Sequence, residues 1–195
     1  LQQYPDVLAE LLRDHTTGRN IFWATNDYEE RGEGYDYYSP ITIESITGEN
    51  EGVIKPRVLK SKENQTDRSK EMAEVFTPSW VCNIMVNNID EKFFGRRDAF
   101  NRETGEERRT WETFRGKIAI PEGKTWEDYV KLRWMEITCG EAPFMTSRYD
   151  TTTGRAIHIE DRIGFLDRKL RIVNENTCNR EDWFDAAVTA YQTSR

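Results

Sequence analysis

The amino-acid sequence predicts an α/β fold, in which a mixed amino-terminal region (residues 1–72) precedes alternating helices and strands (residues 73–195). Three observations lead to this prediction. Helix-start signals stand before several apolar stripes. One apolar stretch runs into a glycine, as a strand does before a turn. All the net charge lies in the first quarter of the chain, which sets that quarter apart from the rest.

Composition excludes several classes of protein. The 195 residues carry a net charge of −7, and residues 1–50 hold it all, with three arginines against ten acids. A globally basic nucleic-acid binder is excluded, because such binding depends on neutralising phosphates. Six Trp, eight Tyr and nine Phe argue against disorder, although only 36% of residues are apolar. The sequence shows no apolar run of about 18 residues and no basic leader. Three scattered cysteines without a C-x-x-C pair indicate a reduced, cytoplasmic protein without zinc.

The amino-terminal region is predicted to be mixed. A short helix over residues 5–13 starts at Pro5, a residue that suits the first helical position, and its apolar residues share one face: Val7, Leu8, Leu11 and Leu12. The segments that follow are predicted as a buried strand (20–25), an acidic Tyr-rich loop (27–39), a strand (41–46), an extended edge (53–60) and a charged helix or linker (61–73).

The second region begins with a helix that Thr77 caps and Pro78 opens. Its predicted apolar stripe is Trp80, Val81, Ile84, Met85, Val86 and Ile89. Residues 92–117 form a long polar connection, which in a compact domain is usually functional or mobile. The elements predicted after it are a capped helix from Thr125-x-x-Asp128, a strand over 134–138, a helix over 163–173 and a last helix from Asn179 to Tyr191.

Two segments carry chemistry. Phe76-Thr77-Pro78 leads into a helix, whose first N–H groups and dipole suit a carboxylate or another anion. Met135 to Met145 is predicted as a strand, a turn at Gly140 and a helix start, the kind of junction at which nucleotide-like cofactors bind. An acid such as Glu136 at a strand end can accept a hydrogen bond from an amine or hydroxyl. Taken alone, the Phe-Thr-Pro segment is better explained as an ordinary helix cap, and a single glycine is weak evidence for anything beyond a plain turn.

Together, and in this order, the two segments resemble the adenine-specific DNA methyltransferases of restriction–modification systems, in the branch called restriction endonuclease subunit M. The resemblance runs from about residue 8 to the end. A Phe-Thr-Pro segment opens the cofactor motifs of that family. The motif that follows is commonly Leu-Asp-Pro-Ala-Cys-Gly-Ser-Gly-Gly-Phe-Leu, which matches Met135, Glu136, Thr138, Cys139-Gly140 and Phe144-Met145. Ala142 and Pro143 replace two glycines, and Ile137 replaces the proline.

The resemblance implies a Rossmann-like domain that binds S-adenosylmethionine and methylates adenine N6 in double-stranded DNA. The residues implied to contact the cofactor are Phe76, Thr77, Pro78, Glu136, Thr138, Gly140 and Ala142. The family holds its flipped-out target base with an Asn-Pro-Pro-Tyr-type motif, but no two of the six prolines here are adjacent. We therefore expect part of a cofactor site, no catalytic residue and no methyl transfer by this chain alone. A specificity or restriction subunit is the expected partner.

Other interpretations remain open. Basic residues in the long connection and in the helix at 163–173 are candidate DNA contacts, although interleaved acids favour simple charge pairing: Arg96, Arg97, Arg108, Arg109, Arg168 and Lys169. A fused nuclease would need clustered carboxylates and a lysine, and Glu44, Glu51 and Lys55 match no such pattern. His15 and His158 stand in no catalytic order. A non-catalytic docking module is the second class of function, since tyrosines are enriched at interfaces and segment 27–39 is rich in them.

Overall fold

The computed structural model describes residues 4–55, 57–59, 77–137 and 140–194. The chain is a mixed fold of helices and strands, divided into two compact units, Leu1–Lys55 and Pro56–Arg195. Each unit is considered by itself. The predicted boundary near residue 72 lies outside the described residues, as do Phe76, Thr138 and the whole of the predicted charged segment 61–73. No helix in the described ranges has both the length and the apolar character that crossing a membrane requires.

The first unit is built around a small aromatic and aliphatic core. Helix α1 (Pro5–Leu12) starts at the proline as predicted, and buries Leu8 and Leu12 against Trp23, Ile41 and Val53. Val7 and Leu11, predicted on the same face, remain 51% and 58% exposed. The other elements are α2 (Ile43–Ile46) and the 3₁₀ turns η1 (Glu29–Arg31) and η2 (Gly48–Asn50).

Two strand predictions in this unit are wrong. Residues 41–46 contain helix α2, because Thr42 and Ser45 form a reciprocal cap that starts a helix. The Thr42 hydroxyl accepts from the Ser45 amide, and the Ser45 hydroxyl accepts from the Thr42 amide. Residues 20–25 form only isolated bridges, Arg13–Asn20 and Phe22–Pro40. In the segment predicted to be extended, Arg57–Leu59 forms the 3₁₀ turn η3.

The second unit packs three helices, α5 (Trp126–Val130), α6 (Phe165–Asn176) and α7 (Arg180–Gln192), against one another. Capping explains where two of them start. Thr125 and Asp128 form the predicted reciprocal cap of α5, and the Asn179 side chain accepts from the Asp182 amide at the start of α7. The helix predicted over 163–173 is found as α6, Phe165–Asn176, and of its predicted inward residues Leu166 and Val173 are buried while Leu170 is half-buried.

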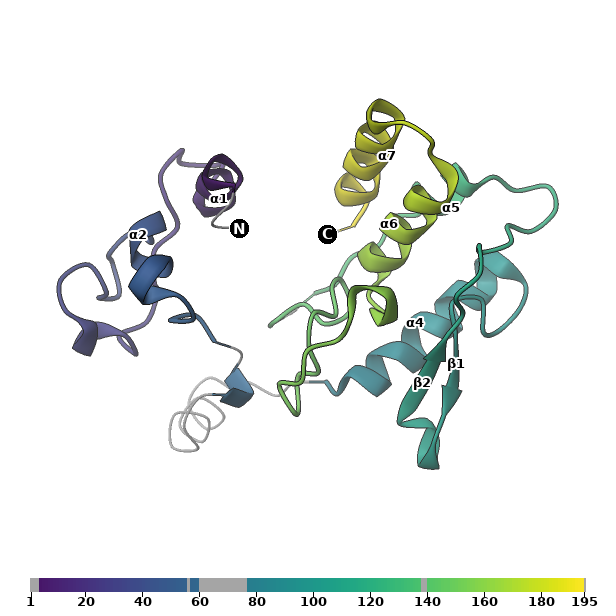
Figure 1. The fold of residues 1–195 in the computed structure, drawn as a ribbon, viewed down its shortest axis with the longest axis horizontal. Helices are drawn as coiled ribbons and strands as arrows, with labels where there is room; N and C mark the ends of the chain where they lie inside the picture. Colours follow the sequence, from purple (N-terminus) through teal and green to yellow (C-terminus); the bar gives the residue numbers. More distant parts are fainter. Residues whose placement is uncertain (1–3, 56, 60–76, 138–139, 195) are drawn as a thin grey trace. The chain divides into compact units, whose positions relative to one another are not determined.

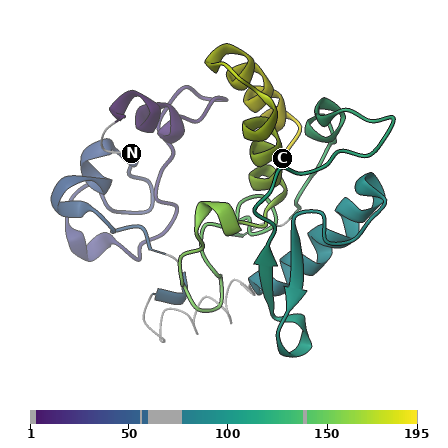
Figure 2. The same cartoon turned by 45° about the vertical axis from the view of Figure 1, so that its right-hand side comes forward.

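Helix α4 (Ser79–Phe94) lies beside the hairpin of β1 (Asn101–Thr104) and β2 (Thr110–Thr113), as the teal segments in Figures 1 and 2 show. The strands are antiparallel, with Asn101 opposite Thr113. Most of the predicted long connection is therefore ordered structure, with the 3₁₀ turn η4 (Glu106–Arg108) at the hairpin tip. Between α4, α5 and α6 the core is aromatic: Phe93, Phe94, Phe100, Tyr129 and Phe165.

The predicted strand at 134–138 is reduced to one bridge, in which Trp134 pairs in parallel with Ser194. The predicted helix start at 141–145 is a series of turns, and the next helix in the chain is α6. The insertion between them contains the 3₁₀ turn η5 (Ile159–Asp161). The order in this part of the chain is thus a strand-like segment at Trp134, a loop rich in turns over 140–145, and then helix α6.

Candidate functional site

The amino terminus of α4 is the first part of the candidate site. Pro78, rather than Thr77, is the capping residue, and no side chain caps the helix. The Pro78 carbonyl accepts from the Val81 and Cys82 amides at 2.9 and 3.2 Å. The amides of Ser79 and Trp80 come before these in the helix, and no acceptor for them occurs within the described residues. They point along the helix axis, where the dipole favours negative charge.

The loop after Trp134 is the second part. Its backbone enters the left-handed region at Gly140, with φ of 49°, and at Ala142, with φ of 51°. A side chain at such an angle is strained, and strain of this kind often marks a functional loop. The Ala142 carbonyl accepts from the Met145 and Thr146 amides at 3.1 and 3.0 Å, which closes the turn. Ala142 thus adopts the backbone conformation that glycine adopts most readily.

Glu136 is folded back onto this loop. Its Oε2 atom accepts a hydrogen bond from the Met145 amide at 2.9 Å. Burial raises the pKa of the Glu136 carboxyl above its ordinary value, while the amides of Met145 and Phe144 oppose that rise. The carboxylate is half-buried, so it remains partly accessible.

The surroundings of the first turn of α4 form a junction, to which Thr151 contributes by direct contact and Glu136 by its charge. The Thr151 hydroxyl donates to the Thr77 carbonyl at 2.7 Å, and the Cys82 thiol lies 3.9 Å from the same oxygen. Burial raises the pKa of the Cys82 thiol to about 12, and the nearby charge of Glu136 adds to the rise. Glu136 therefore lies within electrostatic range of the first turn of α4.

Ser79 and Asp150 lie at the same junction. The Ser79 hydroxyl is fully buried and has no hydrogen-bond partner among the residues that the structure describes. It lies close enough to Asp150 to help lower the pKa of that carboxyl, without reaching hydrogen-bonding geometry. Burial raises the Asp150 pKa, but hydrogen bonds from Thr152 and Thr153 outweigh this, so the net shift is downward. The junction therefore holds the ionised carboxylate of Asp150 next to the Ser79 hydroxyl, which makes no hydrogen bond among the described residues.

The loop is fixed to the start of α6. The Phe144 and Met145 carbonyls accept from the Phe165 and Leu166 amides at 2.8 and 3.1 Å. A Cβ atom on Gly164 would overlap the Met145 carbonyl, so only glycine permits this approach. The end of the 134–145 loop is consequently held against the start of α6.

Two of the predicted DNA contacts, Arg168 and Lys169, are wrong because both side chains are buried. Arg168 is 2% exposed and Lys169 is 0% exposed. Arg168 forms an ion pair with Asp90 at 2.6 Å and donates to the side-chain oxygens of Asn83 and Asn87 at 2.9 and 2.8 Å. Lys169 donates to the Leu132 carbonyl and to the Thr193 hydroxyl, at 2.5 and 2.7 Å. Neither cation is on the surface, so neither is available to DNA.

Sequence reasoning missed the network around Arg168. Asn83, Asn87 and Asp90 lie on one face of α4, and Asn101 on β1 exchanges hydrogen bonds with Asn83 at 2.8 and 3.1 Å. Tyr129 of α5 donates to Asp90 at 2.9 Å. Burial raises the pKa of Asp90, and Arg168 offsets part of the rise. The spacing Asn-x₃-Asn-x₂-Asp was the available signal, because it places three polar groups on one helical face.

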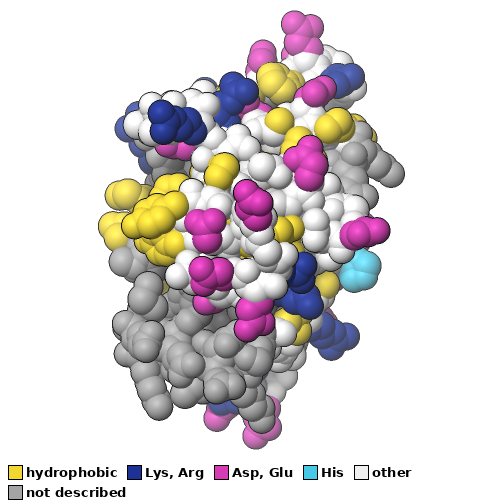
Figure 3. All heavy atoms as spheres, turned by 90° about the vertical axis from the view of Figure 1, so that its left-hand side faces the viewer, with side chains coloured by type: hydrophobic (Ala, Val, Ile, Leu, Met, Phe, Trp, Pro, Cys, Tyr) yellow, Lys and Arg dark blue, Asp and Glu magenta, His cyan; other side chains and the backbone are white. Residues whose placement is uncertain are grey.

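The remaining candidate DNA contacts lie on the hairpin and beside it. Arg108 pairs with Glu103, and Arg109 pairs with Glu107 and lies 5.4 Å from the Trp80 ring. Arg97 donates to Asn88 at 3.1 Å, and Arg96 is exposed. These pairings favour the charge-pairing interpretation for Arg108 and Arg109. Figure 3 shows the molecule from the left-hand side of Figure 1, where acidic and basic side chains both occur on the surface.

The residues considered for a metal site or for histidine-based catalysis do not form a cluster within the described part of the chain. Within the described ranges, no group of three or more His, Cys, Asp or Glu side chains is placed to hold a metal ion. His15 lies 3.6 Å from Glu10 on the surface, and His158 is exposed.

Comparison with protein-family models, with curated proteins and with solved structures finds no match to this chain. The site must therefore be interpreted from its own geometry.

Proposed function

We propose that the second unit is the cofactor-binding part of an adenine-specific DNA methyltransferase of the restriction–modification type, with S-adenosylmethionine as the methyl donor. The observation that carries the proposal is the electrostatic proximity of Glu136, in the 134–145 loop, to Cys82 in the first turn of α4. These two residues are more than fifty positions apart in the sequence.

The donors and acceptors at this junction suit the methionine end of the cofactor. That end carries a carboxylate and an ammonium group. The Trp80 amide at the start of α4, on a half-buried residue, offers a hydrogen bond to a carboxylate. The Glu136 carboxylate has one oxygen occupied by the Met145 amide, which leaves its second oxygen to accept from an amine. The left-handed backbone at Gly140 and Ala142 keeps the loop turn that this family builds with glycines.

The strand-like segment at Trp134 supports the Rossmann-like part of the proposal. Trp134 stacks on Phe165 of α6, with ring centroids 5.3 Å apart and ring planes 9° apart. Met135 and Ile137 alternate with it along the chain and are 73% and 72% exposed. A strand with apolar side chains on both faces is typical of a parallel sheet that is covered on both sides. The parallel bridge to Ser194, reached through α6 and α7, is the pairing with which such a sheet begins.

Because the chain contains no Asn-Pro-Pro-Tyr-type motif, we propose that the pocket for the target adenine is supplied by another polypeptide segment. The residues described here would bind and orient the methyl donor. Methyl transfer itself would depend on holding the adenine amino group in line with the donor.

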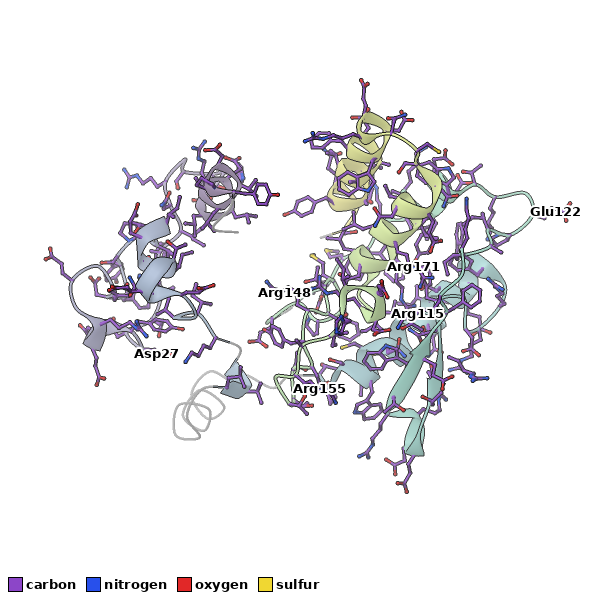
Figure 4. The ribbon with its side chains drawn as sticks, in the orientation of Figure 1. Asp27, Arg115, Glu122, Arg148, Arg155 and Arg171 are labelled. Atoms are coloured by element: carbon purple, nitrogen blue, oxygen red, sulfur yellow. The ribbon has the colours of Figure 1, made fainter. Side chains whose placement is uncertain are left out.

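Isothermal titration calorimetry of the chain with S-adenosylmethionine tests the proposal. We expect micromolar binding, weakened at least tenfold in Glu136→Gln, because the amide cannot accept from an ammonium group as a charged acceptor does. The matched control is Glu122→Gln, an exposed acid in the turn before α5 that lies outside the site (Figure 4). Absence of binding by the unmodified chain, with its folding verified by circular dichroism, would reject the proposal.

The docking-module alternative is supported by one observation. Helix α1 is apolar on two sides, since Leu8 and Leu12 are buried while Val7 and Leu11 are exposed. The same calorimetric titration separates the two classes of function, because a docking module has no reason to bind the cofactor.

A further inference from the structure

We propose that Asp150 makes the candidate site prefer the cationic methyl donor over its neutral product, by placing a negative charge near the sulfonium group. The inference rests on the proposed function, because it takes S-adenosylmethionine as the ligand. It assigns a specificity-determining role to a residue that lies outside both segments named for the cofactor.

Asp150 is held beside the first turn of α4. It lies on a small hairpin, in which its amide donates to the Arg155 carbonyl at 2.8 Å. The next residue, Thr151, is buried and donates to the Thr77 carbonyl at 2.7 Å, which ties the hairpin to the segment that leads into α4. Asp150 also lies close enough to the Ser79 hydroxyl for that hydroxyl to help lower its pKa. The carboxylate is therefore fixed next to the start of the helix.

One oxygen of the Asp150 carboxylate is occupied and the other is not. Oδ1 accepts from the amides and hydroxyls of Thr152 and Thr153, at distances from 2.6 to 3.0 Å. Oδ2 has no hydrogen bond or ion pair within the described part of the chain, and the largest influences on the Asp150 pKa include no cation. The residue is half-buried, so the ionised carboxylate stays open to a ligand.

A second observation points to a ligand at the same place. The Ser79 hydroxyl, next to Asp150, is fully buried and makes no hydrogen bond among the described residues. Buried polar groups in native proteins are nearly always hydrogen-bonded, and an apparent exception is commonly completed by a bound ligand, ion or water. The start of α4 thus combines an incomplete hydroxyl with an uncompensated carboxylate.

The charges of the ligand and of the site match when Asp150 is included. S-adenosylmethionine carries a carboxylate, an ammonium group and a sulfonium group. The Trp80 amide is assigned to the carboxylate and Glu136 to the ammonium group, which leaves the sulfonium charge without a counterpart. Asp150 is the second carboxylate, after Glu136, whose charge raises the pKa of Cys82 in the first turn of α4. It therefore supplies the missing negative charge within electrostatic range of that turn.

A negative charge in this position distinguishes the donor from the product. When the methyl group leaves, its bonding electron pair stays on the sulfur, so S-adenosylhomocysteine has a neutral thioether in place of the sulfonium. The Asp150 charge then attracts the donor without attracting the product. At a partly exposed site such an attraction changes an affinity by about three- to tenfold, even without direct contact. Salt should weaken the effect, because it screens exposed charges.

The test is isothermal titration calorimetry of the 195-residue chain with S-adenosylmethionine, S-adenosylhomocysteine and sinefungin. Sinefungin carries an amine in place of the sulfonium and has no transferable methyl group. We expect the unmodified chain to bind both cationic ligands at least about threefold more tightly than the neutral one. Asp150→Asn should remove most of this preference, because asparagine keeps an acceptor for Thr152 and Thr153 but has no charge.

Two further variants serve as controls. Asp150→Glu retains the charge and should retain the preference, even if it binds every ligand more weakly. Glu122→Gln removes an exposed acid outside the site and should leave the preference unchanged. Circular dichroism verifies that each variant is folded.

The inference is overturned if Asp150→Asn keeps the full preference, or if Glu122→Gln loses it to the same extent. A preference for S-adenosylmethionine that sinefungin does not share would also overturn it, because the methyl group rather than the charge would then be recognised. In each of these cases the cofactor still binds, so the proposed function stands. If the unmodified chain binds none of the ligands, the proposed function is rejected and the inference with it.

Discussion

Arg168→Met should be among the most destabilising single substitutions in the second unit. The guanidinium pairs with Asp90 at 2.6 Å, donates to Asn83 and Asn87, and lies 5.0 Å from the Phe100 ring. Both members of the ion pair are almost completely buried. Removal of one partner from a buried pair costs about 3–5 kcal/mol, chiefly because the other charge is left uncompensated. We expect a loss of that size in the free energy of unfolding at pH 7.

The stability that Arg168→Met loses should depend on pH, and the direction of that dependence follows from the pKa of Asp90. Burial already raises the pKa of Asp90 above its ordinary value of 3.8, and loss of Arg168 removes the charge that opposes the rise. The folded variant then holds a proton that the unfolded chain releases. Its stability is highest at low pH and falls by about 1.4 kcal/mol for each pH unit above the unfolded value, until the folded pKa is reached. Acidification from pH 7 to pH 5 should recover up to about 2.7 kcal/mol.

The assay is urea unfolding followed by tryptophan fluorescence and circular dichroism. In Asp90→Asn/Arg168→Met the carboxylate is absent, so the pH dependence specific to Arg168→Met should disappear. Arg102→Met is the matched control, because it breaks an exposed pair with Glu112, and such pairs contribute only about 0–1 kcal/mol. A penalty for Arg168→Met that is equal at pH 5 and pH 7, or no larger than that of the control, would refute the reasoning.

Three further predictions concern single residues. Burial lowers the pKa of Lys169 to about 8, so the free energy of unfolding should rise as the pH goes from about 8 towards the ordinary value of 10.5, and Lys169→Met should abolish that rise in urea titrations. The Cys82 thiol, whose pKa is raised to about 12, should resist iodoacetamide at pH 8 while the exposed Cys178 is alkylated, and mass spectrometry that finds both labelled alike would contradict this. Gly164→Ala should cost about 1–3 kcal/mol and weaken S-adenosylmethionine binding, because its methyl group would displace the Met145 carbonyl; unchanged calorimetric affinity would contradict this.

Helices that begin with a local cap were predictable. Thr125 with Asp128, and Asn179 with Asp182, form their hydrogen bonds within four residues, so the sequence contains the whole signal. The same kind of local signal explains why Pro5 marks the start of α1.

The hairpin and the buried face of α4 were not predictable in the same way. In the hairpin, Arg102 of β1 pairs with Glu112 of β2, and Thr104 pairs with Thr110. The strands therefore lack the alternation of apolar and polar residues from which a strand can be predicted. On α4, Met85 remains exposed while polar side chains are buried, because they hydrogen-bond Arg168, a residue some eighty positions away. Only tertiary contacts can reveal a buried face of that kind.

The candidate site stays a prediction. Thr77, Glu136 and Ala142 were named from the sequence; Thr77 immediately precedes the start of α4, and Glu136 lies within electrostatic range of its first turn. The contribution of Thr151 was missed, because it comes from the insertion between the loop and α6. No local signal predicts that this insertion meets the residue before α4, because Thr151 and Thr77 are 74 positions apart.

The central claim is that the start of α4 and the 134–145 loop form one binding site for S-adenosylmethionine. Amide hydrogen–deuterium exchange, measured with and without the cofactor, tests it most directly, because it reports on both segments at once. We predict slower exchange together at Ser79–Trp80 and at residues 140–145, with Arg180–Gln192 of α7 unchanged. Protection of only one segment, or of neither at a saturating cofactor concentration, would contradict the claim.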